Sequence, residues 1–437
     1  MELVEIMRSA GIVGAGGAGF PSYAKLAEGA DTLLINGAEC EPLLYTDYTI
    51  LKNEMSEVLA GAAAILGGTS IKRAVLAVKE HTAKRLGFSD GDRLSDVVNV
   101  KILPNVYPIG DEVSLIYQSI GRLVKPGRLP ISVGVIVFNV ETVYNISRAT
   151  RLSQSVSEKW LTVGGDVERA VVLKAPVGMR VSDLFAKLGI LPSEDHVVID
   201  GGPSMGKIIS AESAVVTKTT KALLVLPKGC EAVQSKRINE KMAISRAETA
   251  CCQCTRCTDM CPRTLLGYPL EPHKMVRTAM GAVSLSPEMV KSATLCCGCG
   301  ICESIACSQG ISPKAVINNY KALLAENKMR YSSNAEISVL PERDYRQIPA
   351  SLWASRLGVA RLDKIPEYIG SVSAHRVEIP LNRHIGNPAV CAVGNADTVE
   401  CGSLIAEAQD GLSVPYHASI GGKVSVGINK IMIDKVI

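Results

Sequence analysis

The segment CCQCTRCTDMCP, residues 251–262, decides how the middle of this chain of 437 residues folds. Its cysteines have the spacing C-x2-C-x2-C-x3-C-P, in which a tight loop offers three thiolates to one cubane iron–sulfur cluster and the fourth cysteine binds another cluster. A second segment, CCGCGICESIAC at residues 296–307, has the same spacing with one more residue in its last gap. We therefore expect a helical unit that holds two 4Fe-4S clusters.

Two such segments in tandem predict crossed ligation, in which the last cysteine of each segment binds the cluster of the other. One cluster then has the ligands Cys251, Cys254, Cys257 and Cys307, and the other has Cys261, Cys296, Cys299 and Cys302. The longer gap makes Cys307 the least regular of these ligands. We expect Cys252 and Cys297, which each follow a first ligand, to line the clusters without binding them. The alternative is a pair of zinc sites, but zinc does not usually take three ligands from one loop and a distant fourth.

The composition favours metal ligation over disulfide formation. Ten of the 14 cysteines lie between Cys251 and Cys307, and the N-terminal sequence MELVEIMRSAG lacks the basic start and apolar stretch of a secretory signal.

A net charge of +4 without a basic run argues against nucleic-acid binding. No window is apolar over the roughly 18 residues that a membrane span needs. We therefore expect a cytoplasmic protein.

Strand and helix patterns divide the chain into four units. Residues 1–155 alternate between apolar strands and helices, which is typical of a Rossmann-like α/β domain with a parallel sheet. Residues 156–230 have the short strands of a β-grasp domain, residues 231–330 are the helical two-cluster unit, and residues 331–437 are a linker and a β barrel-sandwich. In the first unit we expect strands at Thr32–Asn36, Arg73–Lys79, Val98–Leu103 and Ile131–Phe138, and helices at Asp47–Leu66, Asp111–Gly121 and Glu141–Thr150.

The first unit also contains GAGGAGFP, residues 14–21, which includes the pattern G-x-G-x-x-G. Dinucleotide binding by this pattern requires a strand directly before it, but residues 1–10 have the periodicity of a helix. The glycines can still bring backbone amides close to a phosphate or a flat ring, and we expect a helix after them whose positive end and Lys25 face an anion. A merely flexible loop is the alternative. Polar segments at strand ends favour the binding role, because open α/β sheets bind ligands there: NGAECEP (36–42), YPIGDE (107–112) and NVET (139–142).

Together these motifs resemble the flavin-binding segments of the NADH-oxidising flavin subunit of respiratory complex I, and more closely those of the Rnf-complex C subunit. The order of flavin domain, β-grasp domain and two-cluster domain is similar as well. In the Rnf C subunit a barrel-sandwich domain precedes the flavin domain, whereas here the similar segments RHIGNPAV (383–390) and LSVPYHASIGG (412–422) follow the clusters. This permuted order and the longer gap before Cys307 resemble the cobalamin reductases of propanediol-utilisation bacterial microcompartments.

The resemblance implies binding residues in the first unit. It implies FMN contacts at Gly14, Gly16, Gly17, Lys25, Asn36, Glu39, Tyr107, Asn139 and Thr142, and nicotinamide contacts of NADH at Phe20, Gly110, Asp111 and Glu112. Ala38 stands where the complex I pattern has an acidic residue, so that contact is expected to differ. Cys40 replaces a serine of that pattern and is expected beside the flavin in a passive role. No acid or base is expected, because hydride transfer to FMN depends on placement and electrostatics.

The function that the resemblance implies is an NADH-dependent oxidoreductase that passes electrons through FMN and two 4Fe-4S clusters to cobalamin inside a bacterial microcompartment. An adenosyltransferase and shell proteins are then expected partners. Two alternatives keep the same redox groups: reduction of a ferredoxin, flavodoxin or radical-enzyme activase, and an electron relay in an Rnf-like membrane complex. The barrel's absence before the flavin domain weighs against the relay. We expect the N-terminal helix to pack on the flavin domain rather than to serve as an encapsulation tag.

Overall fold

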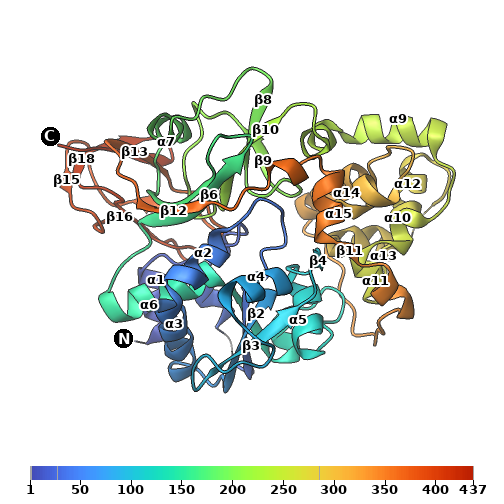
Figure 1. Ribbon diagram of the computed structural model, residues 1–437, viewed down its shortest axis with the longest axis horizontal. Helices are drawn as coiled ribbons and strands as arrows, with labels where there is room; N and C mark the ends of the chain where they lie inside the picture. Colours follow the sequence, from blue (N-terminus) through green and yellow to red (C-terminus); the bar gives the residue numbers. More distant parts are fainter. Residues whose placement is uncertain (1, 27, 285, 437) are drawn as a thin grey trace.

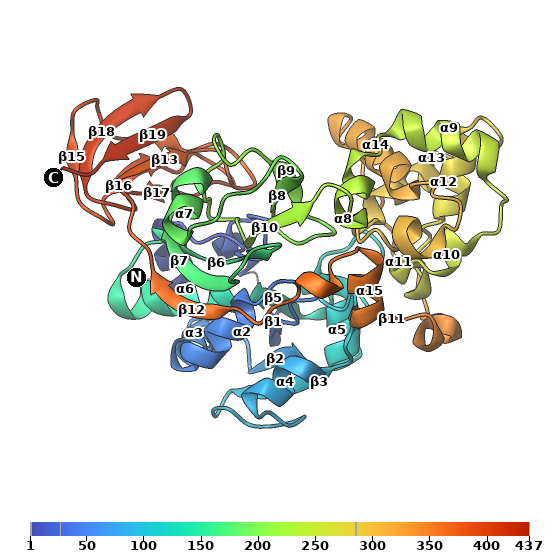
Figure 2. The same ribbon diagram turned by 45° about the horizontal axis from the view of Figure 1, so that its top comes forward.

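The computed structural model describes residues 2–26, 28–284 and 286–436, which form four packed units. In Figure 1 the helical domain, which carries the cysteine segments, and the C-terminal barrel domain lie at opposite ends of the molecule. The N-terminal α/β domain and the β-grasp domain lie between them, and the turned view in Figure 2 shows the same order. Any ligand of the α/β domain is therefore flanked by the cysteine segments on one side and by the barrel on the other.

The α/β domain is built on a parallel sheet in the strand order β3-β2-β1-β5. The predicted parallel pairing is confirmed, and three predicted strands match the observed ones within one residue. Helix α1 buries Leu3 and Met7 in this domain, which confirms that it packs there. The elements are α1 (Leu3–Ser9), η1 (Ser22–Lys25), β1 (Thr32–Gly37), α2 (Thr46–Asn53), α3 (Met55–Gly67), β2 (Arg73–Lys79), α4 (Glu80–Leu86), β3 (Val98–Leu103), β4 (Val106–Tyr107), α5 (Glu112–Ile120), η2 (Pro130–Val133), β5 (Val135–Asn139) and α6 (Val140–Leu152).

Three predicted elements of this domain differ from the structure. The helix predicted at Asp47–Leu66 is two helices, because the backbone of Glu54 leaves the helical region between α2 and α3. The strand predicted to begin at Ile131 begins at Val135, because Pro130 starts a 3-10 turn that ends at Gly134 with φ 73°. The prediction of a helix after the glycine loop was wrong, since among the described residues there only the four-residue 3-10 turn η1 forms.

The β-grasp domain has a six-stranded sheet in the order β12-β7-β6-β10-β8-β9. Its elements are β6 (Glu158–Gly165), β7 (Val171–Pro176), α7 (Val181–Leu188), β8 (His196–Asp200), β9 (Lys207–Ile209), β10 (Ala222–Pro227) and β12 (Glu367–Ser371). Strand β12 comes from the segment predicted as linker and barrel, and it pairs in parallel with β7 at the sheet edge. The chain therefore returns to this sheet after the cysteine segments, so the β-grasp sheet is not continuous in sequence.

The helical domain consists of short helices around the cysteine segments, as predicted. They are α8 (Glu231–Gln234), η3 (Ser235–Arg237), α9 (Glu240–Ala250), α10 (Arg256–Asp259), α11 (Pro262–Leu265), α12 (Pro272–Ala279), α13 (Pro287–Lys291), η4 (Ser292–Leu295), the π-helical turn η5 (Cys302–Ala306) and α14 (Pro313–Glu326). No helix among the described residues of the chain combines the length and the apolar character that crossing a bilayer requires.

A segment that we call the strap, residues 341–362, leads from the helical domain back across the α/β domain. It comprises η6 (Pro341–Tyr345), β11 (Ile348–Pro349), α15 (Ala350–Arg356) and η7 (Ala360–Leu362). The barrel domain follows, with the sheets β13-β19-β18-β15 and β14-β16-β17, which matches the predicted barrel-sandwich. Its strands are β13 (Arg376–Pro380), β14 (Val390–Cys391), β15 (Thr398–Val399), β16 (Leu404–Glu407), β17 (Tyr416–His417), β18 (Gly422–Gly427) and β19 (Lys430–Asp434).

Candidate flavin and iron–sulfur sites

The polar segments predicted to form a binding site meet at the carboxyl edge of the parallel sheet. Asn36 at the end of β1 and Asn139 at the end of β5 are register partners. The Asn36 side-chain amide donates to the Gly110 carbonyl at 3.1 Å, and this hydrogen bond brings the YPIGDE loop to the same edge. A Cβ built on Gly16 would lie 3.6 Å from the Asn139 Cβ, so the glycine loop covers the end of β5. The glycine loop, the YPIGDE loop and the ends of β1 and β5, which are distant in sequence, therefore meet at this edge of the sheet.

Hydrogen bonds between its own backbone groups hold the glycine loop together, and one face of the loop is free of protein atoms. The Gly14 amide donates to the Phe20 carbonyl at 2.8 Å, and the Gly19 amide donates to the Gly14 carbonyl at 3.2 Å. The Ala15 amide donates to the Thr142 hydroxyl at 3.1 Å, which ties the loop to α6. Gly17 has φ 110°, and a Cβ there would meet nothing within 4 Å. This ordered loop with an open face fits a bound ring or phosphate better than it fits a merely flexible loop.

Buried ion pairs form the floor beneath this loop. Lys159 pairs with Glu141 and also donates to the Ala15 carbonyl at 3.1 Å, and both charged side chains are almost fully buried. Lys221 pairs with Asp47, whose other oxygen accepts from the Asn139 amide at 2.8 Å. Burial lowers the pKa of Lys159, which Glu141 partly opposes. Burial also acts to lower the pKa of Lys221, but the surrounding carboxylates raise it overall, so this ammonium stays charged.

The β-grasp domain supplies both of these lysines, and the sequence analysis missed them. Lys159 follows Glu158 in the largely apolar strand β6, and Lys221 directly precedes the apolar strand β10. Such a lysine usually faces solvent, and its sequence alone does not show that it meets a carboxylate of another domain. A lysine within an apolar strand that is buried on both faces was the one available signal.

Glu39 and Lys25 are held by the protein itself. The Glu39 carboxylate accepts the amides of Asp47 at 2.8 Å and Tyr48 at 3.2 Å, at the start of α2. Desolvation raises the pKa of Glu39 to about 7, and the Asp47 carboxylate adds to the rise. The Lys25 ammonium lies 2.9 Å from the Glu112 carboxylate and donates to the Val137 carbonyl at 3.1 Å. Two residues predicted to contact different parts of the ligands thus contact each other.

The YPIGDE loop packs against Cys40 and reaches the helical domain. A Cβ on Gly110 would lie 3.0 Å from the Cys40 sulfur, so a side chain would not fit there without a shift. Burial raises the pKa of the Cys40 thiol to about 12, which keeps it protonated and agrees with a passive role. Asp111 caps α5 and accepts from the guanidinium of Arg263 at 2.7 Å. Arg263 was not predicted, because nothing in the sequence connects it with a loop 150 residues earlier.

The eight predicted cluster ligands line two separate cavities, and all 14 cysteines are free thiols. The exposed cavity is lined by Cys251, Cys254, Cys257 and Cys307, and the enclosed cavity is lined by Cys261, Cys296, Cys299 and Cys302. These are the two sets that crossed ligation predicts. Cys252 lines the first cavity and Cys297 the second. Four thiols of one set around each cavity are a donor set suited to a 4Fe-4S cluster.

The longer gap before Cys307 is absorbed by the π-helical turn η5, Cys302–Ala306. A π turn closes its hydrogen bonds over one more residue than an α turn and often marks a functional site. Here it advances the chain so that Cys307 reaches the exposed cavity while Cys302 stays in the enclosed one. The predicted ligand with the irregular spacing, Cys307, therefore lines the same cavity as the three cysteines of the first segment.

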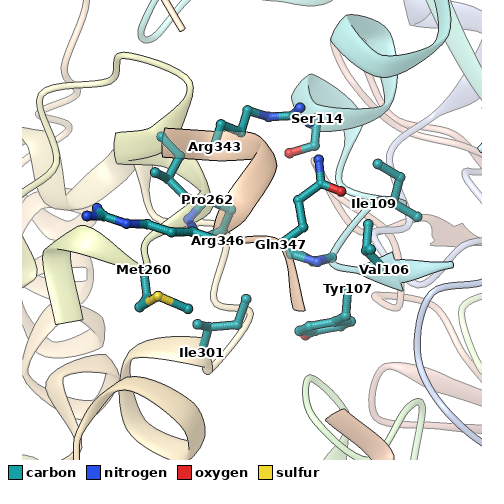
Figure 3. A pocket seen from close by; sticks show the side chains of 12 residues that line it. Val106, Tyr107, Ile109, Ser114, Met260, Pro262, Ile301, Arg343, Arg346 and Gln347 are labelled. Atoms are coloured by element: carbon teal, nitrogen blue, oxygen red, sulfur yellow. The ribbon is translucent and has the colours of Figure 1, made fainter. Parts of the chain in front are cut away.

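The enclosed cavity lies next to the candidate flavin site, and Figure 3 shows the junction between them. Val106, Tyr107 and Ile109 approach from the α/β domain, Met260, Pro262 and Ile301 from the helical domain, and the strap lies between. The Tyr107 hydroxyl donates to the Cys299 carbonyl at 2.8 Å. Its ring stacks on Trp353 of the strap, with centroids 4.5 Å apart and planes at 10°. A predicted flavin residue thus directly contacts a predicted cluster ligand.

Ser204, in the turn Gly201–Gly206, joins three parts of the molecule at this junction. Its amide donates to the Glu41 carboxylate at 2.8 Å, and its hydroxyl accepts from the Trp353 indole at 2.9 Å. Its carbonyl accepts from Lys236 at 2.8 Å and from Lys314 at 3.3 Å, both of the helical domain. The strap and Trp353 were read only as linker, since a segment without periodicity gives no sign of what it packs against.

Three family descriptions match separate parts of the chain. Residues 7–148 match the Nuo51 FMN-binding domain, residues 250–312 match a 4Fe-4S dicluster domain, and residues 369–435 match the RnfC barrel sandwich hybrid domain. These matches agree with the predicted flavin, cluster and barrel-sandwich domains.

Curated relatives match the chain over most of its length. Cobalamin reductase PduS of Salmonella typhimurium is 38% identical over 426 residues, which cover 97% of this chain and 94% of that protein. The protein of the same name from Citrobacter freundii is also 38% identical, over 96% of this chain and 93% of that one. The C component of an ion-translocating oxidoreductase complex from Edwardsiella ictaluri is 31% identical over 61% of this chain and 33% of that protein.

Proposed function

The chain belongs to the family of cobalamin reductase PduS, and from that premise and the layout of its sites we propose that it carries electrons from NADH to cobalamin. It is an oxidoreductase with an FMN-binding domain and a 4Fe-4S dicluster domain. The observation that carries the proposal is the contact between Tyr107 of the flavin site and Cys299 of the enclosed cavity. It makes the two sites neighbours, so electrons have a short route from one to the other.

FMN would be held by the glycine loop and by the strand ends, through Gly14, Gly16, Gly17, Lys25, Asn36, Glu39, Tyr107, Asn139 and Thr142. Bound FMN supplies the conversion between the electron pair of a hydride and single electrons. The chain's own part is placement. The Gly17 face leaves room for a flat ring, and the neutralised pairs Glu141–Lys159 and Asp47–Lys221 give a rigid floor without net charge.

NADH would approach the same pocket at Phe20, Gly110, Asp111 and Glu112. Gly110 packs so closely against Cys40 that no side chain fits there, and Asp111 is kept in place by Arg263 and by its cap on α5. Glu112 pairs with Lys25. An anionic phosphate would compete with Glu112 for that ammonium, so binding of one ligand can adjust the charge offered to the other.

The two clusters would differ in their access to solvent. The enclosed cavity has three buried cysteines, Cys261, Cys299 and Cys302, and faces the α/β domain. The other cavity has the exposed residues Cys252 and Cys254 at its edge. The exposed cavity is the more accessible of the two to an external acceptor, and we therefore propose that the acceptor docks there.

The cofactor content tests the core of this proposal. Protein purified anaerobically is expected to contain one FMN and about eight iron and eight acid-labile sulfide per chain, four of each per 4Fe-4S cluster. It should show flavin absorbance and a paramagnetic signal on reduction. Two zinc ions without sulfide, or colourless protein, would refute it.

The acceptor is tested separately. NADH oxidation is measured with hydroxocobalamin, with a ferredoxin and with a flavodoxin under the same anaerobic conditions. We expect the highest turnover with the cobalamin. Equal or faster reduction of either protein acceptor would instead favour a reductase of ferredoxin or flavodoxin with the same redox groups.

We also propose that the protein works inside a bacterial microcompartment and passes reduced cobalamin to an adenosyltransferase. The family membership supports this. Shell proteins would then be neighbours. The test is co-purification of the chain with intact compartments, and its loss from them when the shell is absent. A chain recovered only outside purified compartments would contradict the proposal.

A further inference from the structure

Two arginines of the helical domain each bury a donor that has no partner. Among the described residues, the Nε atoms of Arg263 and Arg277 are inaccessible to solvent and make no hydrogen bond. Leaving a buried donor unpaired is costly, and more so for a charged group, so folded proteins rarely contain one. Arg263 lines the enclosed cavity and Arg277 lines the exposed cavity. Each cavity therefore has one arginine with an unused N–H group.

The proposed occupants would supply the missing acceptors. A 4Fe-4S cluster with four thiolate ligands is anionic, its sulfurs accept hydrogen bonds, and such hydrogen bonds help to set its reduction potential. The cluster becomes more negative when it takes up an electron. A nearby cationic donor therefore stabilises the reduced form more than the oxidised form and raises the potential.

We propose that Arg277 and Arg263 each donate an Nε–H to a sulfur of the cluster in their own cavity and raise its reduction potential. This inference rests on the cluster assignment above and adds a role for two side chains outside the ligand set. Neither arginine is a ligand, so each acts by tuning the cluster.

The surroundings of the two arginines differ. Arg263 is already paired with Asp111, and its guanidinium lies 5.3 Å from the centroid of the Tyr268 ring. Lys314 also lines the enclosed cavity and pairs with Glu303 at 3.1 Å, and Lys321 donates to the carbonyl of Cys296, a residue of that cavity, at 3.0 Å.

Arg277 takes part in none of the ion pairs found among the described residues. The cavity also has the side chain of His273, which is hydrogen-bonded to Thr258 at 2.7 Å. The charge of Arg277 is therefore the less compensated of the two, and its substitution gives the simpler test.

The test is an anaerobic redox titration of the full-length protein, followed by electron paramagnetic resonance, with iron and sulfide counted in each sample. We expect Arg277→Gln to lower the equilibrium constant for one-electron reduction of one cluster about tenfold, which is ~59 mV. Arg277→Lys keeps the charge but loses the Nε–H donor, so the reduction potential of its cluster should lie between those of the wild type and Arg277→Gln. The other cluster signal should stay in place.

The matched control is Arg256→Gln, which removes the same charge from an exposed side chain within the first cysteine segment. Solvent screens such a charge, so a shift below about twofold is expected. Arg263→Gln should lower the potential of the second signal, because it removes a positive charge and leaves Asp111 beside the cluster without its partner.

The outcomes separate this inference from the proposed function. If the wild type holds no clusters, the proposed function fails first. If its clusters are present but Arg277→Gln, with full iron and sulfide content, titrates like the wild type, only the arginine inference is overturned. Equal shifts in Arg256→Gln and Arg277→Gln would also overturn it, because they would show a general charge effect. Loss of the cluster in both Arg277 variants would assign the residue to folding and overturn the tuning role.

Discussion

The α/β domain and the helical domain are stabilised in different ways. A core of 30 buried residues lies around the parallel sheet and includes helices α1, α3 and α6. The helical domain has two small cores of its own, of six and five buried residues, between helices of 4 to 14 residues, while side chains such as Leu266 and Ile301 are buried in cores shared with the other domains. Isolated helices of that length are marginal in water. The comparison indicates that hydrophobic burial stabilises the flavin site, whereas the cysteine segments depend on their clusters.

Removing the clusters is expected to have the largest effect and tests this contrast directly. Anaerobic chelation of iron should unfold much of residues 240–326, because ligand binding and folding are coupled where the core is small. The sheet of the α/β domain should persist. Hydrogen exchange followed by mass spectrometry measures both regions in one sample, with untreated protein as the control. Unchanged protection in the helical domain would show that its own packing suffices.

Breaking the buried ion pair under the glycine loop should cost the α/β domain about 3–5 kcal/mol, because Glu141→Gln leaves Lys159 buried and without its partner. Chemical denaturation monitored by release of the flavin measures the loss. Glu112→Gln is the matched control, since it breaks the Lys25–Glu112 pair, whose side chains are 31% and 40% exposed. That variant should lose no more than about 1 kcal/mol. Similar losses in both variants would contradict the role of burial.

A change in pH should have a smaller effect on the α/β domain, through Glu39. Its pKa is raised from 4.5 to about 7 in the folded state, so between these values the folded protein binds more protons than the unfolded chain. The contribution of Glu39 to stability is therefore present below pH 4.5 and is lost as the pH rises through about 7. Thermal unfolding from about pH 5 to about pH 8 should show this fall in the wild type, and less of it in Glu39→Gln. A parallel dependence in both proteins would exclude Glu39 as the source.

The smallest effect is expected at the junction between the two domains. Trp353→Phe can keep the ring stack on Tyr107 but loses the hydrogen bond to Ser204, at a cost of about 1 kcal/mol. Ser204 also bonds to the α/β domain and to the helical domain. Without its bond to the strap, these two domains should unfold less cooperatively. Denaturation followed separately by flavin fluorescence and cluster absorbance measures the separation of their midpoints. Trp353→Leu removes the stack too, and a separation no larger than that of Trp353→Phe would contradict a role for the stack.

The sequence predicted what local patterns encode and missed what depends on tertiary contact. Strands β1, β2 and β3 were found because each consists mainly of apolar residues, and the cysteine spacing identified the two sets of cysteines that line the cavities. Lys159, Lys221, Arg263 and Trp353 were missed because each acts on a partner in another domain. The break at Glu54 was missed for the opposite reason, since the apolar periodicity continues through it while the backbone turns.

The barrel domain contacts the glycine loop, and this contact bears on the order in which the domains can follow one another along the chain. The Ile385 amide donates to the Gly19 carbonyl at 2.9 Å. Lys218, from the segment before β10, donates to the carbonyls of Gly11 at 2.8 Å and Pro415 at 2.9 Å. The place of the barrel is thus fixed by contacts beside the start of the flavin domain, whichever end of the chain encodes it. A barrel encoded first, as in the Rnf C subunit, could occupy the same place through a short new connection. Circular permutation that moves residues 376–434 ahead of residue 2 should therefore preserve the assembly.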